Sequence, residues 1–511
     1  MQLFILQLLL LFFGVVVIRA QQPPQQVTVP LNDSIIHNAA IGSGDLQHYY
    51  FSAGSTSLFD RRRSLARRDV PNLFLTLTTC SQPTPPPNYE GDIPSLDVFV
   101  SISNDNTLPG PSQGLLVNNT KFGRVAWEND NPLNDLWIGV VAPTLTENWN
   151  GNWTFEIAVS TEEWVHPLLL DQNNIPYMTL DDTDQTHALF TIDPPSNAQQ
   201  HNSSILIVSN IPKQLLFSRC AANSYRVADY ATNFTDTKRG HQALVSNLTA
   251  ATQYTAYYIE STNAISIPIR MHTKRGANCR LVYNLGFCDQ VAYSVAANPN
   301  DATDSIQTQY DDHAQELFQP FATAIMQYNC DSTKYSLVRN CTDCYNDYKR
   351  WLCSVTIPRC TDSIEDTTEP TINAGGGQMA LRQIEVNHSR NPWIDETLAP
   401  GTYTELLPCI DLCYQVVQSC PPFMEFACPK GDLAALQYGY WFKSVVSGQQ
   451  EDDYFNDSLA VYGVNHPTCN PVGLEETRLV ISEGASLLLF PRNPITSFIM
   501  AIFVLFVSLF L

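Results

Sequence analysis

The sequence has few basic residues and none of the short motifs that mark common enzymes. Its 511 residues include 28 Lys and Arg against 50 Asp and Glu, a formal net charge of −22. A nucleic-acid-binding surface needs cations to neutralise phosphates, so we expect no nucleic acid partner. The sequence also has no GxSxG elbow, HExxH motif, P-loop, Rossmann glycine pattern or EF-hand loop. We therefore expect a non-enzymatic protein with no cofactor, metal or catalytic residue.

Long apolar runs occur only near the two ends of the sequence. Residues 1–20 are apolar up to Ile18 and end at Ala20, which predicts a secretory signal peptide, although no Lys or Arg precedes the run. An uncleaved membrane anchor is the alternative.

The second apolar run covers residues 495–511 and follows a linker at 471–494. Small residues in that linker favour a GPI-attachment signal with Gly484 as the attachment site, and a retained membrane tail is the alternative. Either anchor predicts a protein on the extracellular face of the plasma membrane, reached through the endoplasmic reticulum.

Sequons and cysteines both fit a secretory route. Asn-x-Ser/Thr occurs nine times, which predicts a glycoprotein. The even count of 14 cysteines predicts disulfides, because this compartment is oxidising. Cys341 and Cys344 have zinc-like spacing, but no histidine stands at ligand spacing, so disulfides are favoured. The sequons are Asn32, Asn118, Asn152, Asn202, Asn233, Asn247, Asn340, Asn387 and Asn456, and the cysteines are Cys80, Cys220, Cys279, Cys288, Cys330, Cys341, Cys344, Cys353, Cys360, Cys409, Cys413, Cys420, Cys428 and Cys469.

Two β-sandwich domains are predicted at residues 27–160 and 165–275. Both contain short apolar or alternating runs between Gly, Pro, Asn and Asp clusters. The first loosely resembles a jelly roll. The second contains LTAATQYTAYYIE, which resembles the turn into strand F of fibronectin-III or Ig-like domains, with Tyr254 as the corner residue that bonds back to the backbone.

Three smaller features of the β-rich half lead to separate expectations. Cys80 and Cys220 are the only cysteines before Cys279, and whether they pair across the two sandwiches stays open. The basic run at residues 61–68 favours a solvated loop over a protease-processing site. The acid pairs Asp181–Asp182 and Asp452–Asp453 are expected on the solvated surface.

A cysteine-rich domain is predicted at residues 279–470. Helical spacing of apolar residues predicts helices at 311–328, 342–353 and 405–419. The last helix would carry Cys409, Cys413 and Cys420 within about 40° of one another. The polar stretch 361–404 is expected to be a mobile insert. The resulting fold class is α+β multidomain: all-β sandwich domains followed by a disulfide-rich, mainly helical domain.

Two strings carry a resemblance to a known family. CTDCYNDYKRWLCSVTIPRC and PCIDLCYQVVQSCPPFMEFACP resemble the cysteine-rich region of the fungal stretch-activated calcium-channel regulatory subunit, over about a third of the chain. The region is also similar to Frizzled-type modules and to accessory subunits of the animal sodium-leak channel. The matching residues are Cys341, Cys344, Tyr348, Trp351, Leu352, Cys353, Ile357, Pro358, Arg359, Cys360, Pro408, Cys409, Cys413, Val416, Cys420, Pro421 and Cys428.

The resemblance implies a non-catalytic subunit that binds the pore-forming subunit of the high-affinity calcium channel and is required for calcium influx. The expected partner-binding residues are Tyr348, Lys349, Arg350 and Trp351. We expect them to be exposed, with a place in the core as an equal alternative for Trp351. The alternative function is a cell-surface receptor or adhesion protein that binds a lipid or glycan, and a ligand-sized apolar groove would favour it.

Overall fold

The computed structural model describes residues 28–52, 72–119, 121–129, 135–169, 177–193, 203–260, 264–327, 339–362, 380–440 and 469–473. The chain divides into two compact units: residues 1–167 with 212–224 form unit 1, and residues 168–211 with 225–511 form unit 2. The predicted signal peptide, the basic run at 61–68, the Asp452–Asp453 pair, Gly484 and the run at 495–511 lie outside the described residues.

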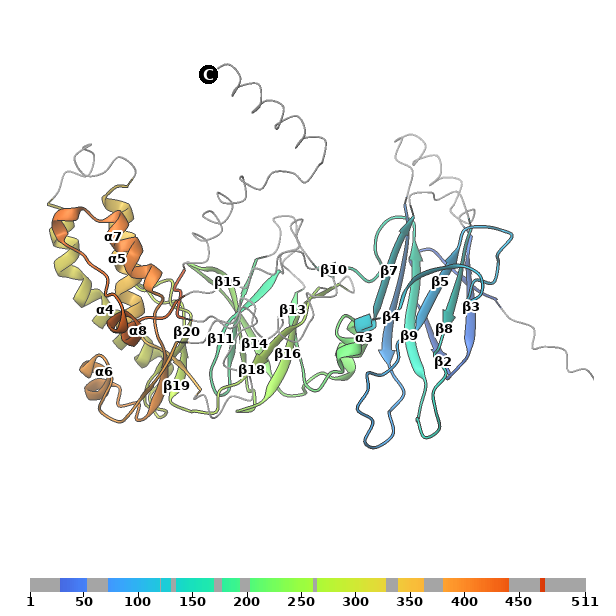
Figure 1. The fold of residues 1–511 in the computed structure, drawn as a ribbon, viewed down its shortest axis with the longest axis horizontal. Coiled ribbons are helices and arrows are strands. Elements are labelled where there is room, and N and C mark those ends of the chain that lie inside the picture. The colour runs from blue at the N-terminus through green and yellow to red at the C-terminus, as the bar shows by residue number, and fades with distance from the viewer. Residues whose placement is uncertain are drawn as a thin grey trace, which may run out of the picture. The chain divides into compact units, whose positions relative to one another are not determined.

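The strands of unit 1, drawn in blue to teal in Figure 1, form two sheets. They pair in the order of a long hairpin that has folded back on itself. β2 pairs with β9, β3 with β8, β4 with β7 and β5 with β6, which is the nesting of a jelly roll. The two sheets have the orders β1-β3-β8-β5-β6 and β2-β9-β4-β7. The strands are β1 (Thr28–Leu31), β2 (His37–Ile41), β3 (Leu46–Phe51), β4 (Leu73–Ser81), β5 (Asp97–Ser101), β6 (Leu115–Asn119), β7 (Arg124–Asn129), β8 (Leu136–Val141) and β9 (Trp153–Ser160).

Alternating apolar side chains from both sheets fill the core of unit 1. In β9, Trp153, Phe155 and Ile157 are buried, and the Phe155 ring contacts Tyr49 of the other sheet with centroids 6.3 Å apart. Full burial of a side chain of this size stabilises the fold by about 1.5–3 kcal/mol. The strand pattern in the sequence therefore builds one continuous core.

The segment 212–224 returns to unit 1 and is held there by a disulfide. It contains the 3-10 turn η4 (Lys213–Leu215) and α3 (Arg219–Ser224). The Phe217 N–H donates to the Phe122 carbonyl at 2.8 Å. Cys220 of α3 bonds to Cys80 of β4. The question left open by the sequence is thus answered: these two cysteines pair, and both belong to unit 1.

Unit 2 begins with two sheets that share one core. One has the order β10-β17-β16-β13 with β18 also on β16, and the other is β11-β12-β15-β14. The strands are β10 (Leu168–Leu169), β11 (Met178–Thr183), β12 (Ala188–Ile192), β13 (Ser204–Val208), β14 (Ala231–Thr237), β15 (Gly240–Ser246), β16 (Gln253–Ile259), β17 (Ile265–Ser266) and β18 (Ile269–His272).

The predicted corner residue of this second sandwich is confirmed. Tyr254 is buried at the start of β16, and its hydroxyl accepts a hydrogen bond from the Thr249 backbone N–H at 3.0 Å. The bond closes the turn that leads into the strand, as a tyrosine corner does.

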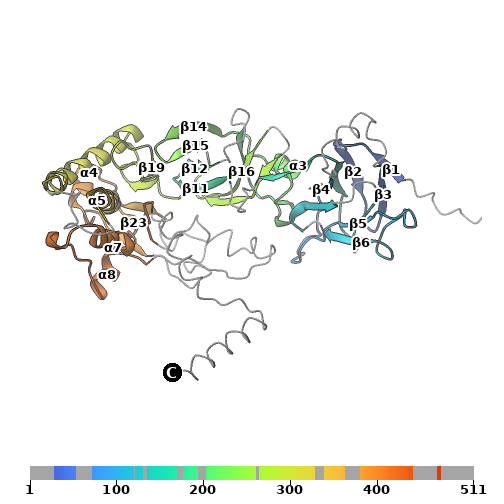
Figure 2. The same ribbon diagram turned by 90° about the horizontal axis from the view of Figure 1, so that it is seen from above.

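The cysteine-rich region of unit 2 combines helices with a sheet of order β19-β20-β21-β23-β22 (Figure 2). The fold is therefore β-rich and disulfide-rich, and this region is less helical than predicted. The elements are β19 (Cys279–Val282), β20 (Tyr293–Ala296), α4 (Thr303–Ile325), α5 (Cys341–Thr356), β21 (Arg359–Thr361), β22 (Leu381–Ile384), α6 (Pro392–Thr397), β23 (Tyr403–Leu406), α7 (Ile410–Ser419), η5 (Pro422–Met424) and α8 (Asp432–Gln437).

Several predicted boundaries differ from the structure. α4 begins at Thr303 rather than near residue 311, because its buried stripe already includes Ile306 and Tyr310. α7 begins at Ile410, since Glu405 pairs in β23. The expected mobile insert at 361–404 is wrong for residues 380–404, which contain β22, α6 and part of β23; residues 363–379 lie outside the described residues.

Disulfides connect the elements of the cysteine-rich region, as predicted. No described cysteine is free. Cys341 is also bonded, and Cys330 lies outside the described residues. The three cysteines expected on one helix have three different partners. The disulfides described in this region are Cys279–Cys360, Cys288–Cys353, Cys344–Cys420, Cys409–Cys469 and Cys413–Cys428.

A buried network of charges joins the second sandwich to the cysteine-rich region within unit 2. Asp182 of β11 accepts from Lys274 Nζ at 2.6 Å and from Arg359 Nε of β21 at 3.1 Å. The Ser294 backbone N–H of β20 also donates to Asp182, at 3.0 Å. Burial opposes ionisation of Asp182, but Arg359 and Lys274 outweigh it and lower its pKa.

The expectation that Asp181 and Asp182 lie on the solvated surface is therefore wrong. Their side chains are 6% and 10% exposed. Asp181 pairs with Arg239 at 3.1 Å, and burial raises its pKa despite that partner. A register shift between Leu180 and Asp182 accompanies the consecutive acids in β11, and both become buried.

Candidate functional site

Helix α5 carries the predicted partner-binding residues, and its start is fixed by a capping box. The Asp343 N–H donates to Asn340 Oδ1 at 3.0 Å, and the Asn340 N–H donates to Asp343 Oδ2 at 2.9 Å. The helix contacts α4 and α7. Its buried face includes Cys344, Leu352 and Cys353.

The two aromatic candidates on α5 are half-buried. The expectation of exposure is therefore wrong for Tyr348, and Trp351 lies between its two expected positions. The Tyr348 ring stacks on Phe321 of α4 with centroids 3.8 Å apart. Trp351 Nε1 donates to the Tyr438 hydroxyl at 2.9 Å. Both side chains contact neighbouring elements, and burial raises the pKa of Tyr348. They position α5 and offer a partner only part of their surface.

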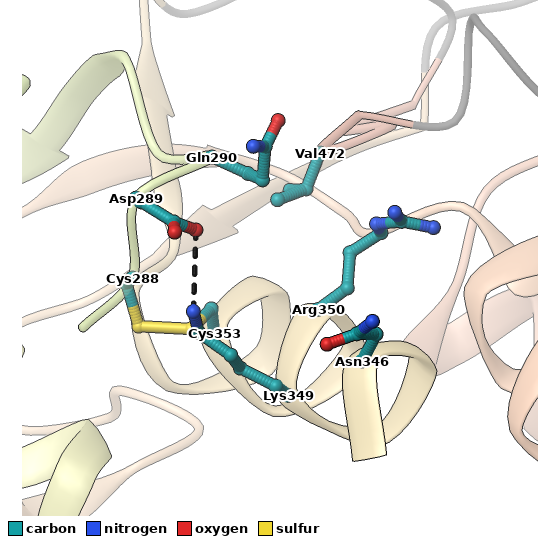
Figure 3. Close-up of a pocket in the computed structure, with 8 residues that line it drawn as sticks. All are labelled: Cys288, Asp289, Gln290, Asn346, Lys349, Arg350, Cys353 and Val472. Carbon is teal, nitrogen blue, oxygen red and sulfur yellow. Dashed lines mark hydrogen bonds and ion pairs between the residues drawn. A yellow bond between two sulfur atoms is a disulfide. The ribbon is translucent and has the colours of Figure 1, made fainter. Parts of the chain in front are cut away.

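The two basic candidates are also half-buried, but both line a cavity of about 230 Å³ (Figure 3). The side chains of Lys349 and Arg350 are 21% and 23% exposed. Figure 3 shows them on one side with Asn346, opposite Asp289, Gln290 and Val472. The cavity lining comes from Cys288, Asp289, Gln290, Asn346, Lys349, Arg350, Cys353 and Val472.

Each cation of this cavity has an internal partner that orients it. Lys349 Nζ lies 3.3 Å from Asp289 Oδ1 and 5.1 Å from the centre of the Phe287 ring. Arg350 lies 3.6 Å from Asp347 and donates to Gln415 Oε1 at 3.2 Å. Burial raises the pKa of Asp347, although Ser419 and Arg350 oppose that shift.

The charge of the lining differs in sign from that of the chain. Two cations and one carboxylate line the cavity, whereas the whole chain carries −22. A half-buried cation held in place loses little side-chain freedom when it pairs with an incoming acid. The arrangement suits polar or acidic groups of a partner rather than an acyl chain.

Some of the residues that line this cavity could be predicted from the sequence. Asn346, Lys349, Arg350 and Cys353 recur at helical spacing, so they share one face of α5. Asp289 and Gln290 were missed. They reach the cavity because Cys288 bonds to Cys353, and sequence alone does not give disulfide connectivity.

One cluster in the described part of the chain has the spacing of a metal site. It consists of Cys80, Glu156 and Cys220. The two sulfurs bond each other, so neither is available as a thiolate ligand. The residues present do not fit a metal ion.

Six of the nine sequon asparagines have described side chains, and all six are exposed: Asn32, Asn152, Asn233, Asn247, Asn340 and Asn387. Asn340 also caps α5, through Oδ1 rather than the Nδ2 to which a glycan attaches. Asn118 has no described side chain, and Asn202 and Asn456 lie outside the described residues. Occupancy of the sequons stays a prediction.

In the described part of the chain, no helix combines the length and apolar character needed to cross a bilayer.

Comparison with known proteins gives a family match over most of the chain. Residues 72–457 match the family described as "Stretch-activated Ca2+-permeable channel component". The chain is similar to the stretch-activated cation channel yam8 of Schizosaccharomyces pombe, with 36% identity over 38% of this chain and 39% of that protein. It is also similar to the stretch-activated cation channel MID1 of Saccharomyces cerevisiae, with 29% identity over 54% of this chain and 47% of that protein.

The matches cover only part of each relative. The aligned part of the chain spans less than half the length of either relative. Among solved structures, the FN1-FN3 domains of chicken CNTN1 are 11% identical over 39% of this chain and 62% of that chain, with a TM-score of 0.15, which supports no fold argument. The resemblance to Frizzled-type modules is not confirmed by these matches.

Proposed function

Since the chain belongs to the family of stretch-activated Ca2+-permeable channel components, we propose that it is a non-catalytic regulatory subunit of a plasma-membrane calcium channel. It binds the extracellular side of the pore-forming subunit and is required for calcium influx. The family match over residues 72–457 carries this proposal. The named relatives are channels rather than enzymes, and they point to the plasma membrane.

The proposed contact surface is the α5 cavity with Lys349 and Arg350. Both cations are held in place by internal partners, and they are the basic residues of a cavity on an acidic protein. An acidic extracellular loop of the pore-forming subunit would complement them. Tyr348 and Trp351 support this surface by fixing α5 against Phe321 and Tyr438.

The test is co-isolation of the pore-forming subunit from membranes, together with calcium uptake. Deletion of this chain should abolish the stimulated uptake. The variant Lys349→Gln/Arg350→Gln should weaken co-isolation about tenfold, the effect of losing roughly 1.4 kcal/mol of binding. Arg382→Gln is the matched control, because Arg382 is an exposed cation on β22 outside the cavity.

Two outcomes would count against the proposal. If the pore-forming subunit does not co-isolate and uptake survives deletion, the subunit function is wrong. If the double variant co-isolates as well as Arg382→Gln does, the function stands but the α5 cavity is not the contact surface. Unchanged disulfide content of the double variant serves as the folding control.

The proposed attachment to the membrane follows from the ends of the chain. Cleavage after Ala20 would place the glycosylated protein outside the cell, and a GPI anchor at Gly484 would replace residues 485–511. Release from intact cells by a phosphatidylinositol-specific phospholipase C is the expected result. Retention after that treatment would instead favour the membrane tail at residues 495–511.

A further inference from the structure

A second cavity in unit 2, of about 80 Å³, lies where the sandwich meets the cysteine-rich region. Its lining includes Asp181 of β11, Arg359 of β21 and Arg239 of the turn between β14 and β15, together with Gln290 and Asn470. It is large enough for a few water molecules or one small ion.

The lining of this cavity contains two guanidinium groups, of Arg239 and Arg359, and one carboxylate, of Asp181. Arg239 donates from one terminal nitrogen to Asp181 at 3.1 Å and from the other to the Gln290 carbonyl at 2.8 Å. Arg359 donates from its Nε to Asp182, which lies behind the lining, and from a terminal nitrogen to the Asp181 carbonyl. Both arginines are therefore held rigidly at the cavity before any ligand enters.

Asn470 supplies an independent sign of a ligand. Its side chain is buried, with the residue 1% exposed, and it lies beside the Tyr293 hydroxyl. Within the described residues, however, neither Nδ2 nor Oδ1 forms a hydrogen bond of ordinary geometry. The hydroxyl of neighbouring Tyr293 already donates to the Ile357 carbonyl at 2.8 Å. The buried Nε of Arg239 also lacks a partner. Buried polar groups in native proteins almost always bind something, and a bound ion or water is the usual partner when no protein group is present.

The backbone holds Asn470 at this position. Its N–H donates to the Leu407 carbonyl at 2.8 Å, and its carbonyl accepts from the Cys409 N–H at 3.0 Å. The adjacent Cys469 is bonded to Cys409. The unpartnered amide is therefore part of a fixed, covalently supported edge of the cavity.

We propose that this cavity binds a phosphate group. The Arg239 Nε and the Asn470 Nδ2 would donate to its oxygens. The three cations Arg239, Arg359 and Lys274 exceed the two carboxylates Asp181 and Asp182 by one charge, which would balance a singly charged phosphate. A protonated phosphate oxygen would donate to Asn470 Oδ1, which a fully deprotonated anion leaves unpartnered. Free inorganic phosphate and the phosphate of a larger monoester share this chemistry. This cavity shares Gln290 and Val472 with the α5 cavity, but its charged residues are different ones.

The test is calorimetric titration of the full-length protein, purified in detergent, with inorganic phosphate at constant ionic strength. Heat of binding and a rise in unfolding temperature should appear with phosphate and not with chloride. Methyl phosphate distinguishes the two sources: binding tighter than that of phosphate assigns a monoester, and weaker binding assigns the free ion. No binding of either would overturn the proposal.

Two substitutions locate the site. Asn470→Leu keeps the side-chain size and removes the amide, so phosphate should bind about tenfold more weakly. Asn470→Asp places a carboxylate beside both arginines, so this variant should unfold at a higher temperature without phosphate and no longer respond to it.

The matched control is Asn346→Leu in the neighbouring α5 cavity, which should leave phosphate affinity unchanged. Phosphate binding by both Asn470 variants at the affinity of the unsubstituted protein would overturn the proposal. So would a loss confined to Asn346→Leu, because the anion would then lie beside Lys349 and Arg350.

Discussion

The jelly roll of unit 1 and the cysteine-rich region of unit 2 are stabilised in different ways. In the jelly roll, large side chains such as Trp153, Phe155 and Tyr49 from two sheets form one core cluster. The main core cluster of the cysteine-rich region is almost as large, but four of its members are the disulfide-bonded Cys288, Cys353, Cys409 and Cys469, and the smaller clusters beside it also contain cysteines. Disulfides are therefore part of the core in this region, and we expect its stability to depend on these covalent bonds between its elements.

The helices of the cysteine-rich region illustrate the same difference. α7 has ten residues and α6 and α8 have six each, and helices this short are not stable alone in water. Each end of α7 is next to a cysteine, Cys409 or Cys420, that bonds to a distant element. The disulfides thus hold in place helices that are too short to be stable alone.

The largest predicted effect comes from reduction. Each bridge contributes about 2–4 kcal/mol, so loss of several exceeds the roughly 5–15 kcal/mol by which a domain is stable. In dithiothreitol, the amides of α5 and α7 should lose their protection from hydrogen exchange, whereas those of β4 and β9 stay protected. Protected α5 and α7 in a sample whose thiols all react with an alkylating agent would contradict the comparison.

A substitution in the jelly-roll core should destabilise unit 1 and leave the cysteine-rich region unchanged. Trp153→Ala removes a fully buried side chain from the jelly roll and should destabilise unit 1 by about 3–5 kcal/mol. Thermal unfolding should show an earlier transition for β-strand amides of unit 1, with α5 and α7 unchanged. Tyr89→Ala, an exposed aromatic residue of the same unit, is the control and should have little effect. An equal shift in both regions would mean that they unfold together.

The next largest loss of unfolding free energy should come from breaking the charge network that joins the sandwich to the cysteine-rich region. Asp182→Asn leaves Lys274 and Arg359 buried without their carboxylate, which should cost about 3 kcal/mol of unfolding free energy. Chemical denaturation measures the loss. Asp312→Asn, on the exposed side of α4, is the matched control. A loss no larger than that of the control would show that the network does not stabilise the junction.

The same residue gives a pH dependence with a defined sign. The folded-state pKa of Asp182 lies below its ordinary value. Its stabilising contribution is therefore present above about pH 4, the unfolded pKa, and is lost as the pH falls through the lower folded pKa. Unfolding temperatures measured from pH 5 downward should fall more steeply for the unsubstituted protein than for Asp182→Asn. Parallel curves would contradict this assignment.

The smallest predicted effect concerns the tyrosine corner. Tyr254→Phe removes one hydrogen bond, from the Thr249 N–H, and should destabilise the second sandwich by about 1 kcal/mol. Tyr414→Phe on the exposed face of α7 should have no measurable effect. Faster hydrogen exchange at Thr249 is the most direct measurement, and unchanged exchange there would mean that the bond contributes nothing.

Local patterns in the sequence predicted what depends on neighbours along the chain. The turn into β16 with Tyr254, the alternating strands and the existence of α5 are all of this kind. The pairing of cysteines followed from their even number and from the oxidising compartment that we predicted, although their connectivity did not. The family itself was recognisable from the cysteine spacing around α5 and α7.

Contacts between distant segments were not predictable in the same way. Asp182 has the sequence pattern of a surface acid, and its burial is stable because Lys274 and Arg359, 92 and 177 positions later, pair with it. The strand pair β21 and β23 is separated by a segment whose polar composition predicted no structure. For this reason only part of the candidate site was predicted. Lys349 and Arg350 lie on one helix, whereas Asp289 comes close to them because the neighbouring Cys288 is bonded to Cys353.

The Cys80–Cys220 bond has a practical consequence for anyone who handles this protein with proteases. The bond closes a ring of chain that leaves the jelly roll after Pro167 and comes back at Pro212. A single cut at any peptide bond within that ring severs the backbone but releases no fragment until a reductant is added. A preparation that migrates as one band on a non-reducing gel can therefore already be cleaved, and only the reducing gel distinguishes an intact chain from a nicked one.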